Sequence, residues 1–97
     1  MSERTHAIER LLEIMRILRA PGGCPWDREQ NHQSIRKDLI EECYELADAI
    51  DLNDDELMRE ELGDLLLNVV FHAQIAAEEG KYTFDDVVQG ICTKMVE

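Results

Sequence analysis

Apolar residues that recur at steps of three and four residues limit most strongly what this chain can fold into. Four stretches carry this spacing, and each is bounded by glycine, proline or a short acidic turn. The spacing is typical of amphipathic helices, and no stretch alternates with the two-residue period of a strand. The expected helices cover residues 5–19, 34–51, 54–79 and 83–97. Because the turns between the last three are short, the sequence predicts an all-α, four-helix bundle-like fold with antiparallel neighbours.

Local signals place three of the helix starts. Ser34 and Asp54 are residue types that cap helices by accepting a hydrogen bond from a backbone N–H, and we expect them to start the second and third helices. Thr83, followed three residues later by Asp86, resembles a capping box with Asp in place of Glu. Gly80 is expected to end the third helix, because glycine adopts the left-handed conformation that closes many helices.

The apolar segment from Leu62 to Ala77 is difficult for a single small chain to cover. Its apolar residues lie on nearly every side of the expected helix, which in a globular protein indicates burial all round. A chain of 97 residues buries only about 60–65% of the surface that its unfolded form exposes. We therefore expect a homo-oligomer, a dimer or a tetramer, in which a second chain covers this helix.

The formal net charge of −12 excludes one class of partner. A chain this acidic repels a phosphate backbone, so we expect no nucleic acid polymer as a partner. No stretch reaches the roughly 18–20 apolar residues of a membrane span, and the charged start does not resemble a signal peptide, so the cytoplasm is the expected location. The cysteines show no C-x-x-C spacing and are expected to be reduced and mostly buried. They are Cys24, Cys43 and Cys92.

Two pairs of carboxylates, each spaced by one helical turn, form the main candidate site. Glu42 and Glu45 lie about 60° apart on the second expected helix, with Glu42 at the edge of its apolar stripe. Glu61 and Asp64 have the same spacing on the third helix, and Asn68 continues their line into the apolar run. Carboxylates on facing helices repel one another unless cations neutralise them, and oxygen ligands suit Mg²⁺ or Mn²⁺. Taken singly, either pair also fits a solvated helix face.

Three sequence segments occur in a fixed order around these pairs. They are CPWDREQNH, EECYELADAI and EELGDLLLNVVFHAQIAAEEG, and they place Glu-Glu-x-x-Glu fifteen residues before Glu-x-x-Asp. The joint pattern resembles the MazG family of nucleoside triphosphate pyrophosphohydrolases, and it covers nearly the whole chain. The resemblance implies an all-α oligomer that cleaves nucleoside triphosphates to the monophosphate and pyrophosphate with Mg²⁺.

The resemblance also implies roles for single residues. The positions of the family's metal ligands are Glu42, Glu45, Glu61 and Asp64. Glu41, the first acid of the motif, is a candidate for holding a second metal ion or for orienting the attacking water. Lys94 resembles the first residue of a Lys-x-x-Arg-Arg segment that contacts phosphates. The other substrate-binding candidates are Trp26, His32 and Asn68.

Residues 21–33 contain two prolines and two glycines without periodicity, so we expect a loop throughout. Within it, Trp26 either stacks on a nucleotide base or pins the loop onto the helices. His32 either contacts substrate or is a surface hydrogen-bonding group.

The chain ends at Glu97, before the arginines of the Lys-x-x-Arg-Arg segment. We expect a single MazG-type domain over residues 1–97, which is truncated at its C-terminus relative to the family or is the first half of a tandem protein. The expected function is the housecleaning of nucleotide pools. The alternative is a catalytically inactive module that dimerises or regulates within a tandem-domain protein.

Overall fold

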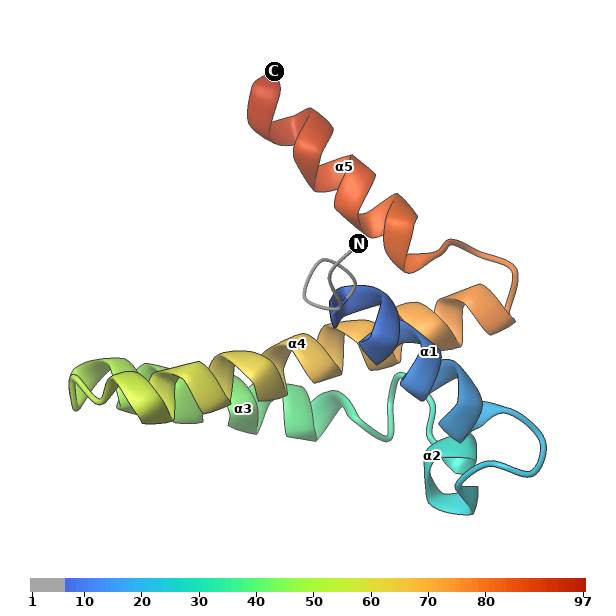
Figure 1. Cartoon of the computed structure of the whole chain (residues 1–97), viewed down its shortest axis with the longest axis horizontal. Helices are drawn as coiled ribbons and strands as arrows, with labels where there is room; N and C mark the ends of the chain where they lie inside the picture. Colours follow the sequence, from blue (N-terminus) through green and yellow to red (C-terminus); the bar gives the residue numbers. More distant parts are fainter. Residues whose placement is uncertain (1–6) are drawn as a thin grey trace. The chain divides into compact units, whose positions relative to one another are not determined.

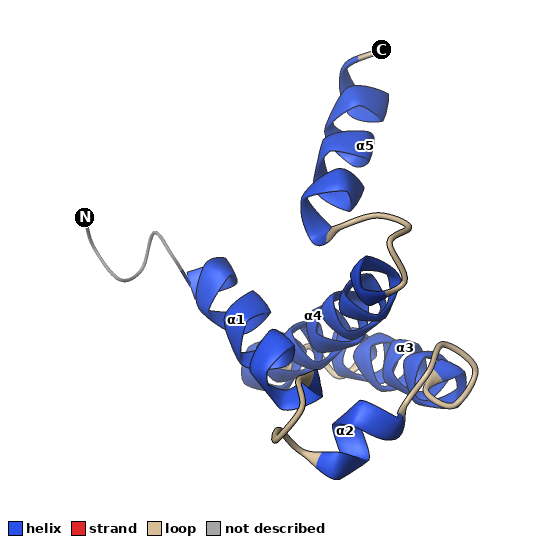
Figure 2. Cartoon of the chain, turned by 90° about the vertical axis from the view of Figure 1, so that its right-hand side faces the viewer, coloured by secondary structure: helices blue, strands red, loops and turns tan. Residues whose placement is uncertain are grey.

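The computed structural model describes residues 7–97, which form five α-helices and no strand (Figures 1 and 2). The helices are α1 (Ala7–Arg19), α2 (Pro25–Glu29), α3 (Arg36–Asp51), α4 (Asp55–Glu78) and α5 (Phe84–Val96). The predicted all-α class is confirmed, whereas the predicted start of the first helix at residue 5 lies outside the described residues. None of these five helices is long and apolar enough to cross a membrane.

The chain divides into two compact units. One, which we call the central unit, comprises Gln30–Val69 and contains α3 with the first part of α4. The other, the terminal unit, comprises residues 7–29 with residues 70–97 and contains α1, α2, the rest of α4 and α5. Within the central unit, α3 and α4 run side by side in opposite directions (Figure 1). The assembly of the helices into one four-helix bundle stays a prediction.

The segment 21–33 is not a loop throughout, and that prediction was wrong, because Pro25–Glu29 form the short helix α2. Proline is well suited to a first helical position, where its fixed φ matches the helix and its missing N–H is not needed. The first backbone hydrogen bond of this turn runs from Arg28 N to Cys24 O at 3.0 Å. A helix of five residues is too short to show hydrophobic periodicity.

Ser34 does not cap the second long helix, and that prediction was wrong. The N-cap of α3 is Ile35, which makes no side-chain capping bond. The Ser34 hydroxyl is used by the preceding turn instead, where its Oγ accepts a hydrogen bond from Asn31 N at 2.9 Å and donates to Gln30 Oε1 at 2.8 Å. The Asn31 backbone and the Gln30 side chain therefore take the hydrogen bonds of this hydroxyl in place of the α3 backbone.

The other helix boundaries follow the sequence signals. Asp54 accepts a hydrogen bond from Leu57 N at 3.1 Å, as a cap of α4 should. Thr83 and Asp86 form the predicted capping box of α5, with Asp86 N donating to Thr83 Oγ1 at 3.2 Å and Thr83 N donating to Asp86 Oδ2 at 2.9 Å. Gly80 follows α4 with φ of +71°, which is the left-handed conformation expected there.

Arg19 ties three elements of the terminal unit together. Its side chain is only 7% exposed and binds the Glu78 carboxylate of α4 at 2.9 Å. The guanidinium also lies 5.5 Å from the centre of the Phe71 ring and donates a hydrogen bond to the backbone oxygen of Asp27 in α2. The buried Arg19 guanidinium therefore links the end of α1 to the short helix α2 and to the second part of α4.

Burial along α4 is uneven, and the expectation of burial all round is met only in its second part. The buried residues of that part are Val70, Phe71, Ala73, Ile75 and Ala76. In the first part, Leu62, Leu66 and Val69 are 51%, 40% and 38% exposed in the single chain. The cysteines are free as predicted, but Cys43 and Cys92 are exposed and only Cys24 is partly buried, so their predicted burial was wrong.

Candidate metal centre

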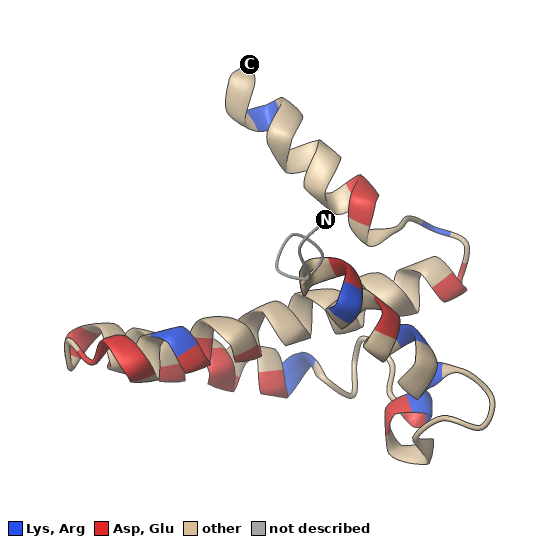
Figure 3. Ribbon diagram, viewed as in Figure 1, with Lys and Arg blue, Asp and Glu red and all other residues tan. Residues whose placement is uncertain are grey.

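The candidate site lies on α3 and the adjoining first part of α4, where acidic residues gather on both helices (Figure 3). The turn between the two helices is short, from Leu52 to Asp54, so α3 and the first part of α4 are neighbours within the central unit. Carboxylates from two separate stretches of sequence therefore come together within the central unit.

Glu42 lies in the middle of the buried face of α3, not at its edge as predicted. Seven residues are nearly two helical turns, so Ile35, Glu42 and Ala49 share one face, and they are 2%, 8% and 0% exposed. The Glu42 Oε2 atom is buried and has no hydrogen-bond partner. A buried carboxylate oxygen without a donor is costly, and a bound cation is one way to remove that cost.

Three of the four predicted metal ligands converge. Glu42, Glu45 and Glu61 each bring a carboxylate oxygen into a group whose members lie within 4.8 Å of one another. Burial, followed by the charges of Glu45 and Asp64, raises the pKa of Glu42. Burial, followed by the charge of Glu42, raises the pKa of Glu61 to about 7. The site without a cation therefore disfavours full ionisation of its own carboxylates.

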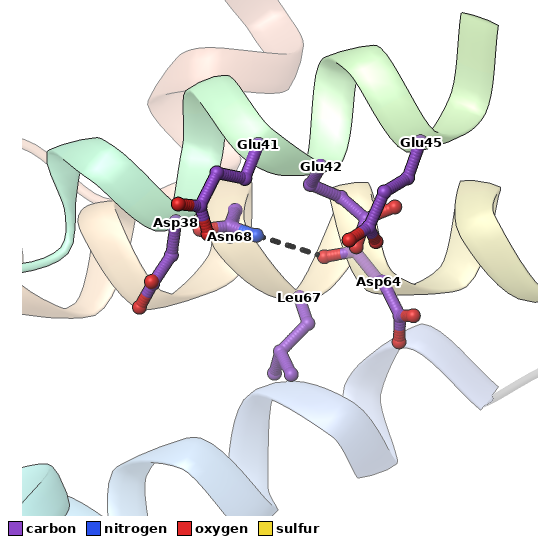
Figure 4. A pocket seen from close by; sticks show the side chains of 7 residues that line it. All are labelled: Asp38, Glu41, Glu42, Glu45, Asp64, Leu67 and Asn68. Carbon is purple, nitrogen blue, oxygen red and sulfur yellow. Dashed lines mark hydrogen bonds between the residues drawn. The ribbon is translucent and has the colours of Figure 1, made fainter. Parts of the chain in front are cut away.

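Two members of this cluster, Glu42 and Glu45, line a cavity of about 270 Å³ in the central unit (Figure 4). Asp64, the fourth predicted ligand, lies on the cavity wall beside the cluster of three. Glu41 also lines the wall, and Lys37 Nζ lies 3.7 Å from its Oε1. Asn68 lines it as well and donates from Nδ2 to the backbone oxygen of Asp64 at 3.1 Å. The full lining is Asp38, Glu41, Glu42, Glu45, Asp64, Leu67 and Asn68.

The residues present fit a hard divalent cation. The cluster offers only oxygen atoms, which favours Mg²⁺ or Mn²⁺ over Zn²⁺. Its buried member, Glu42, has an oxygen without a hydrogen-bond donor, and the cavity leaves room for further ligands such as water. Glu42, Glu45 and Glu61 are therefore the candidate ligands of such a cation, with Asp64 on the cavity wall beside them.

The other predicted substrate residues do not line this cavity. Trp26 lies on α2 in the terminal unit, where its ring packs edge-on against Phe71 at a centroid distance of 6.5 Å and remains 57% exposed. Lys94 is exposed in the last turn of α5. His32 is partly buried in the turn before α3. The contact with Phe71 fits the prediction that Trp26 pins its segment, and substrate contact by these three residues stays a prediction.

Sequence reasoning missed Asp38, which lines the cavity from the first turn of α3. A signal was present, because Asp38 lies four residues before Glu42 and therefore one helical turn away on the same side of α3. Leu67 was counted only as part of the apolar run, although it also lines the cavity.

The fold and the site together define a small all-α domain with a cluster of carboxylates, a candidate cation site, on two antiparallel helices. The family model described as the MazG nucleotide pyrophosphohydrolase domain matches residues 30–97, which include both carboxylate pairs. The chain belongs to this family.

Relatives are similar over nearly the whole chain. The chain is 53% identical over 96 residues to a nucleoside triphosphate pyrophosphohydrolase/pyrophosphatase MazG of Thermotoga maritima, an alignment that covers 99% of the chain. It is 51% identical to a nucleoside triphosphate pyrophosphohydrolase of Escherichia coli, over 91% of the chain, and 44% identical to one of Mycobacterium tuberculosis, over 97%. The chain spans 38%, 34% and 29% of the length of these three relatives.

Proposed function

We propose that this domain hydrolyses nucleoside triphosphates to the monophosphate and pyrophosphate with Mg²⁺, or with Mn²⁺ in its place, as a housecleaning enzyme of the cytoplasm. The observation that carries the proposal is the buried Glu42 carboxylate, which has an unpartnered oxygen and belongs to a three-carboxylate cluster inside the segment that matches the family. The names of the relatives support the triphosphate substrate.

The chain's own residues hold and orient the reacting groups in this proposal. Glu42, Glu45 and Glu61, with Asp64 beside them, hold the cation. When bound, Mg²⁺ supplies charge for the phosphate oxygens and lowers the pKa of a water ligand. Glu41, on the same wall, accepts a hydrogen bond from the attacking water and orients it.

Binding of the remainder of the nucleotide is assigned to the other predicted residues. The amide of Asn68 lies on the cavity wall, where its oxygen accepts a hydrogen bond from the substrate. The exposed face of Trp26 offers a stacking surface for a base, Lys94 offers a positive charge for phosphate, and His32 offers a hydrogen-bonding group.

Pyrophosphate release from a panel of canonical and modified triphosphates tests the function. The chain should release pyrophosphate only with Mg²⁺ or Mn²⁺, and Glu42→Gln should lower the rate by at least about a hundredfold if the metal ligand is lost. Glu60→Gln is the matched control, because Glu60 is an exposed acid of α4 outside the cavity. A chain that binds the cation yet releases no pyrophosphate from any triphosphate would instead be the inactive regulatory module.

We also propose that the domain works as a homodimer or tetramer. Leu62, Leu66 and Val69 recur at steps of four and three on α4, so they form one apolar stripe that the single chain leaves 38–51% exposed. A second copy that covers this stripe removes apolar surface from water.

A further inference from the structure

Lys37 is a basic residue at the edge of the acidic cavity that takes no part in the proposed metal site. Basic residues lie at the beginning of α3, next to acidic ones (Figure 3). Lys37 and Glu41 are four residues apart on this helix, and the Lys37 Nζ atom lies 3.7 Å from the Glu41 Oε1 atom. Since Glu41 lines the cavity, this contact places an ammonium group beside the cavity wall.

No other lysine or arginine of the central unit, which is described throughout, is placed in this way. The unit contains Arg36, Lys37 and Arg59. Arg36 lies roughly 120–180° around α3 from each α3 residue of the lining, so it is on the opposite side of the helix. Arg59 pairs with Glu56 on α4 at 2.6 Å, and neither residue lines the cavity. Lys37 is therefore the basic side chain of this unit that a ligand in the cavity meets.

A nucleoside triphosphate needs a positive side chain on this wall. Five of the seven lining residues are carboxylates, and none is basic. A divalent cation carries two positive charges, whereas its candidate ligands Glu42, Glu45 and Glu61 carry three negative charges when ionised. The phosphate oxygens that the cation does not hold therefore face carboxylates of the same sign, unless a basic group lies between them.

The ion pair between Lys37 and Glu41 is weak enough to be exchanged for a phosphate. The two side chains are 84% and 55% exposed, so water and salt screen their attraction. A phosphate oxygen offers the ammonium group a charge-assisted hydrogen bond in place of the one to the carboxylate. The exchange also releases Glu41, which the proposed function requires for orienting water.

We propose that Lys37 binds a phosphate oxygen of the substrate at the edge of this cavity, so that the cation and a lysine of α3 hold the triphosphate together. The inference rests on the proposed function, which supplies the triphosphate. The contact is made within the central unit and does not depend on Lys94 of α5.

Binding of a triphosphate analogue that cannot be cleaved tests this contact. The probe is the α,β-methylene analogue of the triphosphate that is cleaved fastest, or of ATP if none is cleaved, titrated into the full chain with Mn²⁺ by calorimetry. Lys37→Gln should weaken binding roughly tenfold, because one hydrogen bond between charged groups is lost. Lys37→Arg should stay within about twofold, because it keeps the positive charge.

Lys81→Gln is the matched control for the charge change. Lys81 is also an exposed lysine that pairs with a glutamate, with its Nζ atom 3.5 Å from Glu79 Oε1, but it lies in the turn after α4 and outside the cavity. This variant should bind the analogue as the unchanged chain does. Equal affinities of Lys37→Gln and the unchanged chain would overturn the proposal.

Mn²⁺ binding without nucleotide separates a direct contact from a general disturbance of the cavity. Removing a positive charge beside five carboxylates should leave the Mn²⁺ affinity unchanged or raise it. Lys37→Gln should therefore bind the analogue more weakly without binding the ion more weakly. A parallel loss of affinity for Mn²⁺ and for the analogue would show that the substitution damages the metal site, and it would contradict a phosphate contact.

The pyrophosphate assay reports separately on the proposed function. Binding of the analogue through Lys37 by a chain that releases no pyrophosphate would refute the enzyme and keep the contact. Pyrophosphate release by a chain whose affinity for the analogue does not depend on Lys37 would do the reverse. A chain that neither binds the analogue nor releases pyrophosphate would refute both.

Discussion

Glu42 occupies a position where an apolar side chain would stabilise the domain more. It lies between Ile35 and Ala49 on the buried face of α3, and its carboxylate has an oxygen without a partner. Burying an ionised carboxylate costs several kcal/mol unless a counter-charge or hydrogen bonds compensate it. The domain therefore gives up stability at Glu42, and in the proposed function the binding of a cation there restores it.

The acidic cluster predicts a pH-dependent stability of the metal-free domain. The pKa of Glu61 is raised to about 7, so between pH 4.5 and 7 the folded state binds more protons than the unfolded state. Stability from this residue is fully present below pH 4.5 and is lost as the pH rises to about 7. Urea unfolding in the presence of a chelator should give a falling midpoint across that window, and Mg²⁺ should restore the midpoint at pH 7.5.

The variant Glu61→Gln should flatten this pH dependence, because its amide does not titrate. Glu60→Gln removes a neighbouring, exposed charge of α4 and should keep the slope of the unchanged chain. Equal slopes for Glu61→Gln and the unchanged chain would contradict the assignment of the raised pKa to Glu61.

At the scale of elements, Arg19 should be the residue that holds α2 in place. Replacing it with alanine removes a charged hydrogen bond to Glu78, the contact with Phe71 and the bond to the Asp27 carbonyl. We expect Arg19→Ala to lower the free energy of unfolding by about 2 kcal/mol, measured by urea unfolding.

The matched control for Arg19 is Arg16→Ala. Arg16 pairs with Glu13 on the same helix, but both side chains are more than half exposed. Water and salt screen exposed pairs, so this variant should change stability little. An equal loss in both variants would show that burial of Arg19 does not matter.

The helix α5 should depend strongly on its N-terminal cap. None of its residues is buried in the single chain, so local interactions carry more of its stability than packing does. Thr83→Ala removes the capping box and should destabilise the helix by about 1 kcal/mol. Amide hydrogen exchange in α5 should then be roughly fivefold faster, which exchange measurements on the two proteins can check. Thr93→Ala, in the interior of the same helix, should not speed exchange, because alanine favours helix.

Helix starts that depend only on the capping residue and its own helix could be predicted from the sequence. Helix starts at which other polar groups compete for the capping side chain could not. The Thr83 cap was predictable because its partner, Asp86, is set by helix geometry alone. The Ser34 cap was not, because Gln30 and Asn31 compete for the same hydroxyl. The central position of Glu42 was missed for a related reason, since a hydrophobicity pattern counts glutamate as solvent-facing.

The site was predictable to the extent that its residues share a regular spacing. The pairs of Glu42 with Glu45 and Glu61 with Asp64 follow from helical periodicity and from the family pattern, and three of these four form the cluster. The position of Asp38 on the cavity wall could not be predicted from the sequence. It depends on which turns of α3 face the cavity, and the packing of α3 against α4 decides that.

At the scale of the whole molecule, many large apolar side chains are exposed that a single chain does not bury. The central unit exposes the stripe of Leu62, Leu66 and Val69, and α5 exposes apolar residues along its length, including Ile91 and Met95 at 51% and 77%. Apolar surface of this kind marks interaction sites in soluble proteins. The acidic cluster and the apolar stripe both include residues of the first part of α4, so the proposed active site and the proposed subunit contact share this helix.

Light scattering after size-exclusion chromatography tests the assembly. The unchanged chain should elute as a dimer or tetramer, because covering the stripe buries apolar surface at roughly 25 cal/mol for each Å². Leu66→Asp places a charge in the middle of the stripe and should shift the protein toward the monomer. Leu52→Asp makes the same change at a leucine that is 68% exposed in the turn before α4 and should leave the assembly intact. A stable monomer of the unchanged chain at micromolar concentration would show that no second copy covers the stripe. Dissociation of both variants would show that an added charge alone separates the chains, wherever it is placed.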